Sequence, residues 1–287
     1  MHAPTFSIIT AARACPDRVH CLVRDLARQS WQRWELVVSV DDPEPGAGAA
    51  YAAALRDESR ARLSPRKRRA TGPGAARNDA VAVAGGDYIV LLDADDSLRD
   101  DYLQAFAAHF HRHPECMVAL APTRIVREDR LGDAPILFAP ALGASGAVSI
   151  DDYSKLLVST HVVCCRKAHV PWPEDCFAED VVRDALLVAG AGTVPVVPTE
   201  YRARIHQGQY TQTSGLTERE IRQTYVRLAA LHPKLAPLFL YRAAANSVFA
   251  SRREAGDDWY TFWSRHRDEI PLLEEVETGA NSLRVAS

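Results

Sequence analysis

The sequence lacks any long apolar stretch, and no segment approaches the ~20 consecutive apolar residues that a membrane-spanning helix needs. Its first residues also lack a basic segment followed by an apolar one, so we expect no signal peptide. No G-x-G-x-x-G follows an expected strand, which excludes a dinucleotide-dependent oxidoreductase. A net charge of only −3 argues against nucleic acid as the main partner. We expect a cytoplasmic protein without a membrane span, with peripheral attachment to the inner face of the membrane as an alternative.

The cysteines do not form a recognisable metal or redox motif. Six are present, none with C-x-x-C spacing, and one adjacent pair would make a strained disulfide. We therefore expect reduced thiols. Hydrophobic residues at 47% and charged residues at 25% are ordinary globular values, and 287 residues can form a core domain with a smaller appendage.

A continuous apolar run, Tyr88 to Leu92, leads directly into three acids, Asp93, Asp95 and Asp96. Such a run is typical of a strand buried on both faces in a parallel sheet, and ligands bind at the carboxyl ends of such strands. Carboxylates gathered there repel one another unless a cation joins them, and Mg²⁺ or Mn²⁺ prefers oxygen ligands. The alternative is a polar turn in which Asp96 or Ser97 caps the next helix.

The preceding residues predict two further strands and the helices between them. The expected strands are 5–10 and 35–40, and the second ends at Asp41 and Asp42. Helices are expected from Pro16, through the Ala- and Arg-rich segment that ends at Ser64, and over 75–84. This alternation predicts an α/β fold with a mostly parallel, Rossmann-like sheet flanked by helices. The basic run 66–69 is expected to be a solvated surface, with a role near a phosphate as the alternative.

Four motifs occur in a characteristic order and spacing. They are Phe-Ser-Ile-Ile-Thr at 6–10, Val-Asp-Asp at 40–42, Gly-Pro-Gly-Ala-Ala-Arg-Asn at 72–78 and Tyr-Ile-Val-Leu-Leu-Asp-Ala-Asp-Asp at 88–96. Together they resemble the nucleotide-sugar domain of the family 2 glycosyltransferases, which are inverting enzymes with the GT-A fold and a DxD motif. The close match covers roughly the first third of the chain. The resemblance implies transfer of a sugar from a nucleoside diphosphate sugar, with UDP favoured, to a hydroxyl of a glycan or lipid-linked acceptor.

The resemblance also implies roles for particular residues. Asp95 would be the main ligand of Mn²⁺ or Mg²⁺, Asp93 would bind the ribose or lie in the outer shell of the metal, and His206 would be a third metal contact. The base and ribose would be held by Asp41, Arg77 and the backbone of Thr10 and Ala11. The acid pair Glu179-Asp180 would supply the catalytic base, Asp180, with Glu179 as its substitute. Asp96 would contact the donor sugar or cap the following helix.

The second half of the chain predicts a smaller helical part. We expect a GT-A domain over 1–214 and a helical extension over 215–287, with helices at 218–231, 235–250 and 257–266. The aromatic residues of the extension either pack on the catalytic domain or form a homodimer contact. Residues 131–149 are expected to form a loop over the site. Trp172 is equally consistent with a sugar-stacking platform and with an anchor in the core.

Two other functions remain open at this point. One is a non-catalytic nucleotide-sugar-binding subunit of a glycan-assembly complex, against which the presence of both Asp180 and the Asp93/Asp95 pair argues. The other is a sugar-1-phosphate nucleotidyltransferase. That class carries a Gly-rich loop after its first strand, where this chain reads Thr-Ala-Ala-Arg-Ala.

Overall fold

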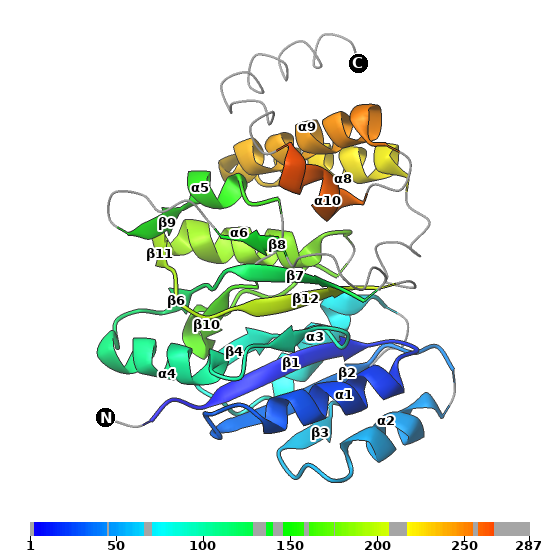
Figure 1. Cartoon of the computed structure of the whole chain (residues 1–287), viewed down its shortest axis with the longest axis vertical. Helices are drawn as coiled ribbons and strands as arrows, with labels where there is room; N and C mark the ends of the chain where they lie inside the picture. Colours follow the sequence, from blue (N-terminus) through cyan, green and yellow to red (C-terminus); the bar gives the residue numbers. More distant parts are fainter. Residues whose placement is uncertain are drawn as a thin grey trace.

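A computed structural model describes residues 3–44, 46–65, 71–128, 136–139, 146–157, 161–174, 176–206, 217–254 and 258–266. The centre of the molecule is a six-stranded sheet with the order β3-β2-β1-β4-β10-β6 (Figure 1). Its strands, in that spatial order, are Ala61–Leu63, Trp34–Val40, Phe6–Ala12, Tyr88–Leu91, Val163–Cys165 and Val118–Ala119. The first four are parallel, and β10 runs antiparallel to both of its neighbours.

Alternation along the parallel strands produces two separate cores. Ile8, Val38 and Val90 face one cluster, whereas Ile9, Val37 and Leu91 face the other. Helices α1 (Pro16–Ala27), α2 (Ala47–Leu55) and α4 (Tyr102–Arg112) bury their apolar residues in the first cluster. Helices α3 (Pro73–Val83) and α6 (Glu179–Ala191) cover the opposite face. The sheet is therefore enclosed by helices on both sides, as the unbroken apolar runs predict.

One expected helix is replaced by a strand near its end. The helix expected up to Ser64 stops at Leu55, and β3 follows and pairs in parallel with β2. Ala and Arg favour a helix, but backbone pairing with an open sheet edge outweighs this local preference. The basic run 66–69 lies outside the described residues.

A second sheet contributes the other wall of the site. Its order is β5-β12-β7-β8, with bounds Ser97–Leu98, Tyr201–Ile205, Thr123–Arg127 and Ile136–Phe138. β9 (Ala147–Ser149) pairs separately with β11 (Thr193–Pro195). The expectation of a loop over 131–149 is therefore wrong for β8 and β9; residues 131–135 and 140–145 lie outside the described part. β7 is not among the strands expected from the sequence. Its alternation Thr-Arg-Ile-Val-Arg is nevertheless typical of a half-buried strand, and only Thr123 and Ile125 are fully buried.

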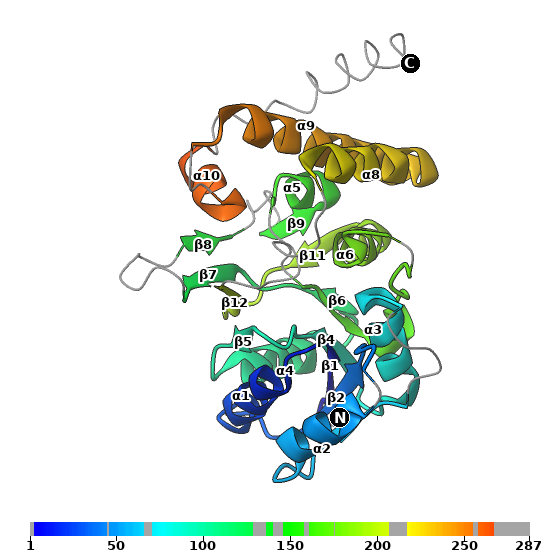
Figure 2. The ribbon, with the colours of Figure 1, turned by 90° about the vertical axis from the view of Figure 1, so that its right-hand side faces the viewer.

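The C-terminal helices lie above α5 (Ile150–Ser154) and α6 (Figure 2). They are α8 (Glu218–Leu231), α9 (Ala236–Arg252) and α10 (Trp259–Arg265), with a short 3-10 turn at Pro233–Leu235 between the first two. Another 3-10 turn, Arg166–Ala168, follows β10. Tyr225, Leu228, Leu238 and Phe239 belong to the same apolar cluster as Leu91 of the central sheet. The expected division at residue 214 lies outside the described residues. Within the described ranges, no helix has the length and apolar character needed to cross a membrane.

Candidate active site

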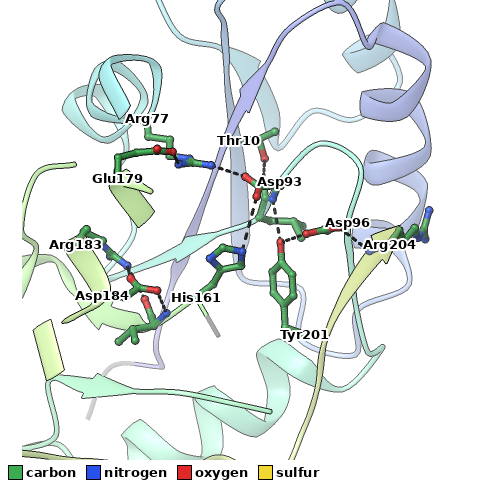
Figure 3. A network of polar contacts seen from close by, with 12 residues as sticks. Thr10, Arg77, Asp93, Asp96, His161, Glu179, Arg183, Asp184, Tyr201 and Arg204 are labelled. Carbon is green, nitrogen blue, oxygen red and sulfur yellow. Dashed lines mark hydrogen bonds and ion pairs between the residues drawn. The ribbon is translucent and has the colours of Figure 1, made fainter. Parts of the chain in front are cut away.

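Side chains from four separate parts of the chain meet at the carboxyl end of β4 (Figure 3). Asp93 and Asp96 follow β4, Arg77 comes from α3, Glu179 begins α6, and Tyr201 lies on β12. The expected location of the acids, just beyond a buried parallel strand, is therefore observed. Sheet topology explains the location of the acids, because ligands bind at the carboxyl ends of parallel strands.

Arg77 is buried and joins the two acidic motifs. Its Nη2 donates to Asp93 Oδ1 at 2.7 Å, and its Nη1 donates to Glu179 Oε1. Burial lowers the pKa of Arg77, but the carboxylates of Asp93, Glu179 and Asp180 more than compensate and raise the pKa overall. Although burial acts in the opposite direction, the nearby Arg77 and His161 lower the pKa of Asp93. Arg77 therefore stays charged and holds Asp93 ionised.

Glu179 and Asp180 begin α6 in different environments. Glu179 is 8% exposed, and burial raises its pKa to about 7, against the effect of Arg77 and with the help of Asp180. Asp180 is half-buried, and its side chain makes no hydrogen bond or ion pair with the described residues. Ala178, the residue before them, has a φ of 65°, a conformation unusual for a residue with a side chain. The sharp turn at Ala178 precedes two acids at a helix N-terminus, where the helix dipole favours negative charge.

Asp96 links the central sheet to the second sheet. Its Oδ2 accepts from the Tyr201 hydroxyl at 2.6 Å, and its Oδ1 accepts from the Arg204 backbone N–H at 2.9 Å. The Tyr201 hydroxyl in turn accepts from the Asp93 backbone N–H at 3.2 Å. Asp96 does not cap the next helix, since α4 begins only at Tyr102. The pKa of Asp96 is well above its ordinary value because of burial and the neighbouring Asp95 and Asp93.

Asp95 and His206 lie together on the same edge. Asp95 Oδ2 is 2.9 Å from His206 Nε2, and the two side chains are 28% and 14% exposed. They come from the turn after β4 and from the residue after β12. A carboxylate oxygen suits Mg²⁺ or Mn²⁺, and an imidazole nitrogen is a common ligand of metal ions in proteins. The pair that the resemblance implied as metal ligands is thus adjacent in space.

His161 is a functional candidate that the sequence reasoning missed. Its Nε2 lies 3.8 Å from Asp93 Oδ2, and Asp93, Asp96 and His161 offer ligand atoms that all lie within 4.8 Å of one another. His161 has a φ of 45° and packs edge-on against Tyr201. An isolated histidine just before a short strand has no motif around it, so only the fold reveals this position.

A buried ion pair supports the segment after His161. Arg183 and Asp184 of α6 are fully buried and bonded to each other at 2.7 Å. Arg183 Nη1 donates to Val162 O at 2.8 Å, and Asp184 Oδ2 accepts from Val162 N–H at 3.0 Å. Helix α6 therefore binds both the N–H and the carbonyl oxygen of Val162, the residue that follows His161. The helical spacing places Asp184 on the same face of α6 as Val181 and Val188, so its charge is buried beside Arg183.

Trp172 belongs to the core and not to an open sugar platform. It is 1% exposed, and the Arg183 guanidinium lies 4.6 Å from its ring centroid. Asn78 of α3 binds the Trp172 backbone twice, at 2.9 Å to the carbonyl oxygen and at 2.9 Å from the N–H. This contact holds the loop before α6 against the middle of α3. Of the two roles considered for Trp172, the burial of its side chain favours that of a structural residue in the core.

Apart from Arg77, the residues expected to hold the base and ribose lie at the ends of β1 and β2. The Thr10 hydroxyl donates to Leu92 O at 2.7 Å, which ties β1 to the start of the acidic turn, and Ala11 follows it in β1. Asp41 accepts from the backbone N–H groups of Thr71 and Gly72, at 3.0 and 2.9 Å. Asp41 thereby fixes the entrance to α3, the helix that carries Arg77.

Comparison with known proteins agrees with this architecture. Residues 7–158 match the family model described as "Glycosyl transferase family 2". The succinoglycan biosynthesis protein ExoO of Rhizobium meliloti (strain 1021) is 36% identical over 101 residues, which cover 35% of this chain and 28% of that protein. The chain therefore matches less than a third of that relative's length.

Solved structures of S. aureus TarS share the fold. TarS 1-349 in complex with UDP-GlcNAc matches with a TM-score of 0.65 at 18% identity, over 96% of this chain and 83% of that one. The complex of TarS 1-349 with UDP gives a TM-score of 0.53 at 17% identity, over 99% and 92%. The expected GT-A fold, with a mostly parallel sheet flanked by helices, is confirmed. Since the family model covers more than half of the chain, this protein belongs to glycosyl transferase family 2.

Proposed function

We propose that this glycosyltransferase moves a sugar from a UDP-sugar to a hydroxyl group of a glycan or lipid-linked acceptor, with inversion at the anomeric carbon. The observation that carries the proposal is the Arg77 bridge between Asp93 and Glu179. It joins the acidic turn after β4 to the acid pair that begins α6, two motifs that lie far apart in the sequence. A donor-binding group and a candidate base thus share one edge of the sheet.

Asp180 is the proposed general base. In the reaction, the acceptor oxygen forms a bond to the anomeric carbon while the bond from that carbon to the diphosphate oxygen breaks. The electron pair leaves with UDP, and the acceptor proton passes to the Asp180 carboxylate. The half-buried position of Asp180 and its lack of a hydrogen bond among the described residues suit this role. Glu179 is engaged by Arg77 and is the weaker candidate.

Asp95 and His206 are the proposed metal ligands, with Asp93 beside them. The oxygen and nitrogen donors of this set fit Mn²⁺, and Asp93 would bind the ribose or the outer shell of the metal. When bound, a divalent cation would act as a Lewis acid that stabilises the charge on the departing diphosphate. Asp41, Arg77 and the Thr10-Ala11 backbone are the proposed contacts for the base and ribose.

The names of similar proteins support the substrate class. One relative is a succinoglycan biosynthesis protein, and one structural neighbour holds UDP-GlcNAc. We therefore propose a role in polysaccharide synthesis and a uridine nucleotide as donor.

Titration calorimetry with a panel of nucleoside diphosphates tests the proposal. UDP with Mn²⁺ should bind, and EDTA should weaken the binding by about tenfold or more, because the diphosphate loses its main countercharge. Asp42→Asn serves as a control, since Asp42 bonds to the backbone of Ala14 and Glu44 outside the proposed metal set. Equal UDP affinity with and without EDTA would refute the metal assignment. Preference for a guanosine or thymidine diphosphate would refute the uridine assignment.

A further inference from the structure

The last described helix, α10, is attached to the second sheet beside the proposed site. Asp258 caps the helix by accepting from the backbone N–H groups of Tyr260 and Thr261, both at 3.0 Å. The same carboxylate pairs with Arg127 of β7, whose side chain is 5% exposed. Arg127 also donates to the Thr261 hydroxyl at 3.0 Å. Figure 2 shows the result: α10 lies over β8 and β7.

This attachment places Tyr260 next to the end of β12. Tyr260 packs against the apolar cluster of Ile125, Phe138 and Ile205, and its ring meets Phe138 edge-on with centroids 6.4 Å apart. Ile205 immediately precedes His206, the proposed metal ligand. Tyr260 itself is half-buried, so part of its surface remains accessible.

The electrostatic surroundings of Tyr260 agree with this location. Burial raises the pKa of the Tyr260 phenol, and the carboxylates of Asp96, Asp180, Asp258 and Asp93 raise it further. Apart from Asp258 of its own helix, these are acids of the proposed site. The phenol thus lies within the field of Asp180. In Figure 2, α10 and α3 lie on opposite sides of the molecule.

We propose that Tyr260 forms the acceptor-side wall of the site, so that the acceptor sugar ring binds between α10 and the N-terminus of α6. An aromatic face with a hydroxyl beside carboxylates is suited to a pyranose, which presents C–H groups to the ring and hydroxyl groups to the acids. Tyr260 is then a specificity-determining residue supplied by the C-terminal helices. This inference rests on the proposed function, because it takes Asp180 as the base.

The test measures binding of a panel of p-nitrophenyl β-glycosides to the full-length protein saturated with UDP and Mn²⁺. Saturation-transfer NMR gives the glycoside Kd, and calorimetry gives the UDP Kd. Tyr260→Ala should weaken glycoside binding by about tenfold, the loss expected when an aromatic contact is removed. The glycoside Kd of Tyr260→Phe, which keeps the ring, should lie between the values for the native protein and Tyr260→Ala. The UDP Kd should stay within about twofold of the native value in both variants.

Ser264→Ala is the matched control, because Ser264 lies on the same helix and bonds only to Thr261 O among the described residues. It should leave both dissociation constants unchanged. The inference is overturned if Tyr260→Ala binds glycosides like the native protein, if UDP binding falls in parallel, or if no glycoside binds the UDP-loaded native protein. The proposed function fails separately, if glycosides bind in a Tyr260-dependent way in the presence of UDP and Mn²⁺ but calorimetry detects no binding of UDP to the native protein.

Discussion

At the residue scale, the carboxylates of the site outnumber the positively charged side chains beside them. Asp93 and Glu179 both pair with the Arg77 guanidinium, Asp180 adds a third negative charge nearby, and Asp93 also lies beside His161. Arg77 keeps Asp93 ionised, whereas burial raises the pKa of Glu179 to about 7. A dication bound by Asp95 would relieve the remaining repulsion. The donor would supply negative phosphates to that cation.

Asp180→Asn separates a catalyst from a binding module. If Asp180 is the base, this variant should bind UDP normally but transfer sugar about 10²-fold more slowly or worse. Asp95→Asn should instead weaken metal and UDP binding together, because it removes charge from the proposed cation site. Steady-state transfer rates, UDP titrations and thermal melts on both variants provide the comparison.

A purely structural role for Asp180 predicts a different result. Replacement of an acid at a helix N-terminus by Asn would cost about 1 kcal/mol or less of stability and leave turnover largely intact. Near-native transfer by Asp180→Asn would move the base role to Glu179 or another acid.

The raised pKa of Glu179 predicts a pH dependence of stability in the ligand-free protein. Between the ordinary glutamate pKa of about 4.3 and the folded value of about 7, the native protein binds more protons than the unfolded chain. The Glu179 contribution to the free energy of unfolding therefore falls as pH rises through this window. From pH 5 to pH 8, the native protein should lose about 2 kcal/mol relative to Glu179→Gln.

Urea unfolding of both proteins at pH 5, 6, 7 and 8 measures this difference. Glu220→Gln is a control, because Glu220 is an exposed acid in the Thr217 capping box and its pKa is lowered. A difference between native protein and Glu179→Gln that stays constant over the range, or that grows in favour of the native protein, contradicts the prediction.

At the scale of elements, the N-terminus of α3 approaches the loop before α6 so closely that it requires glycine. A Cβ on Gly74 would lie 2.1 Å from the Pro173 carbonyl oxygen and 3.4 Å from Glu179 Cγ. The Asn78 contacts with Trp172 hold the same two segments together. The Gly-Pro-Gly motif therefore permits the packing that brings Arg77 to Glu179.

Gly74→Ala should consequently lower the free energy of unfolding by about 2 kcal/mol or more, since the clash is with backbone. It should also reduce transfer, because Arg77 and Glu179 would move apart. Gly48→Ala is the matched control: Gly48 lies in α2, and nothing lies within 4 Å of a Cβ built there. That change should stabilise by about 0.5–1 kcal/mol through helix propensity. Similar stabilities for the two variants in chemical denaturation would rule out the close-approach argument.

At the scale of the whole molecule, the C-terminal helices share a core with the sheet domain. Leu228 of α8 and Phe239 of α9 belong to the cluster that also contains Ile9 and Leu91. The Arg242 guanidinium of α9 donates to Leu156 O at 2.7 Å. We propose residues 1–214 as the GT-A catalytic part and 215–287 as an extension that is stable only in contact with it.

A chain ending at residue 216 should therefore aggregate or melt well below the full-length protein, because part of the core face of α5 and α6 would become exposed. Size-exclusion chromatography and thermal melts measure this. Sedimentation of the full-length protein tests the alternative of a homodimer contact. A monodisperse truncated chain with the same melting temperature and activity would show that the helices are dispensable.

The sequence by itself determined the local features of this protein. The apolar runs specify buried parallel strands, and the acids that follow β4 must lie at the carboxyl edge of the sheet. The i, i+3, i+4 pattern of Val19, Leu22 and Val23 specifies the buried face of α1. These conclusions depend only on periodicity and on residues close in the sequence.

Only the tertiary structure decided which distant residues meet. No local sequence pattern indicates that His161 lies beside Asp93, that Tyr201 donates a hydrogen bond to Asp96, or where Tyr260 lies. Each of these depends on contacts between separate segments. Trp172 could be assigned to the core only once its neighbours were known, and β3 exists because β2 offers an open edge. Side-chain partners across elements are set by packing, which a one-dimensional pattern does not encode.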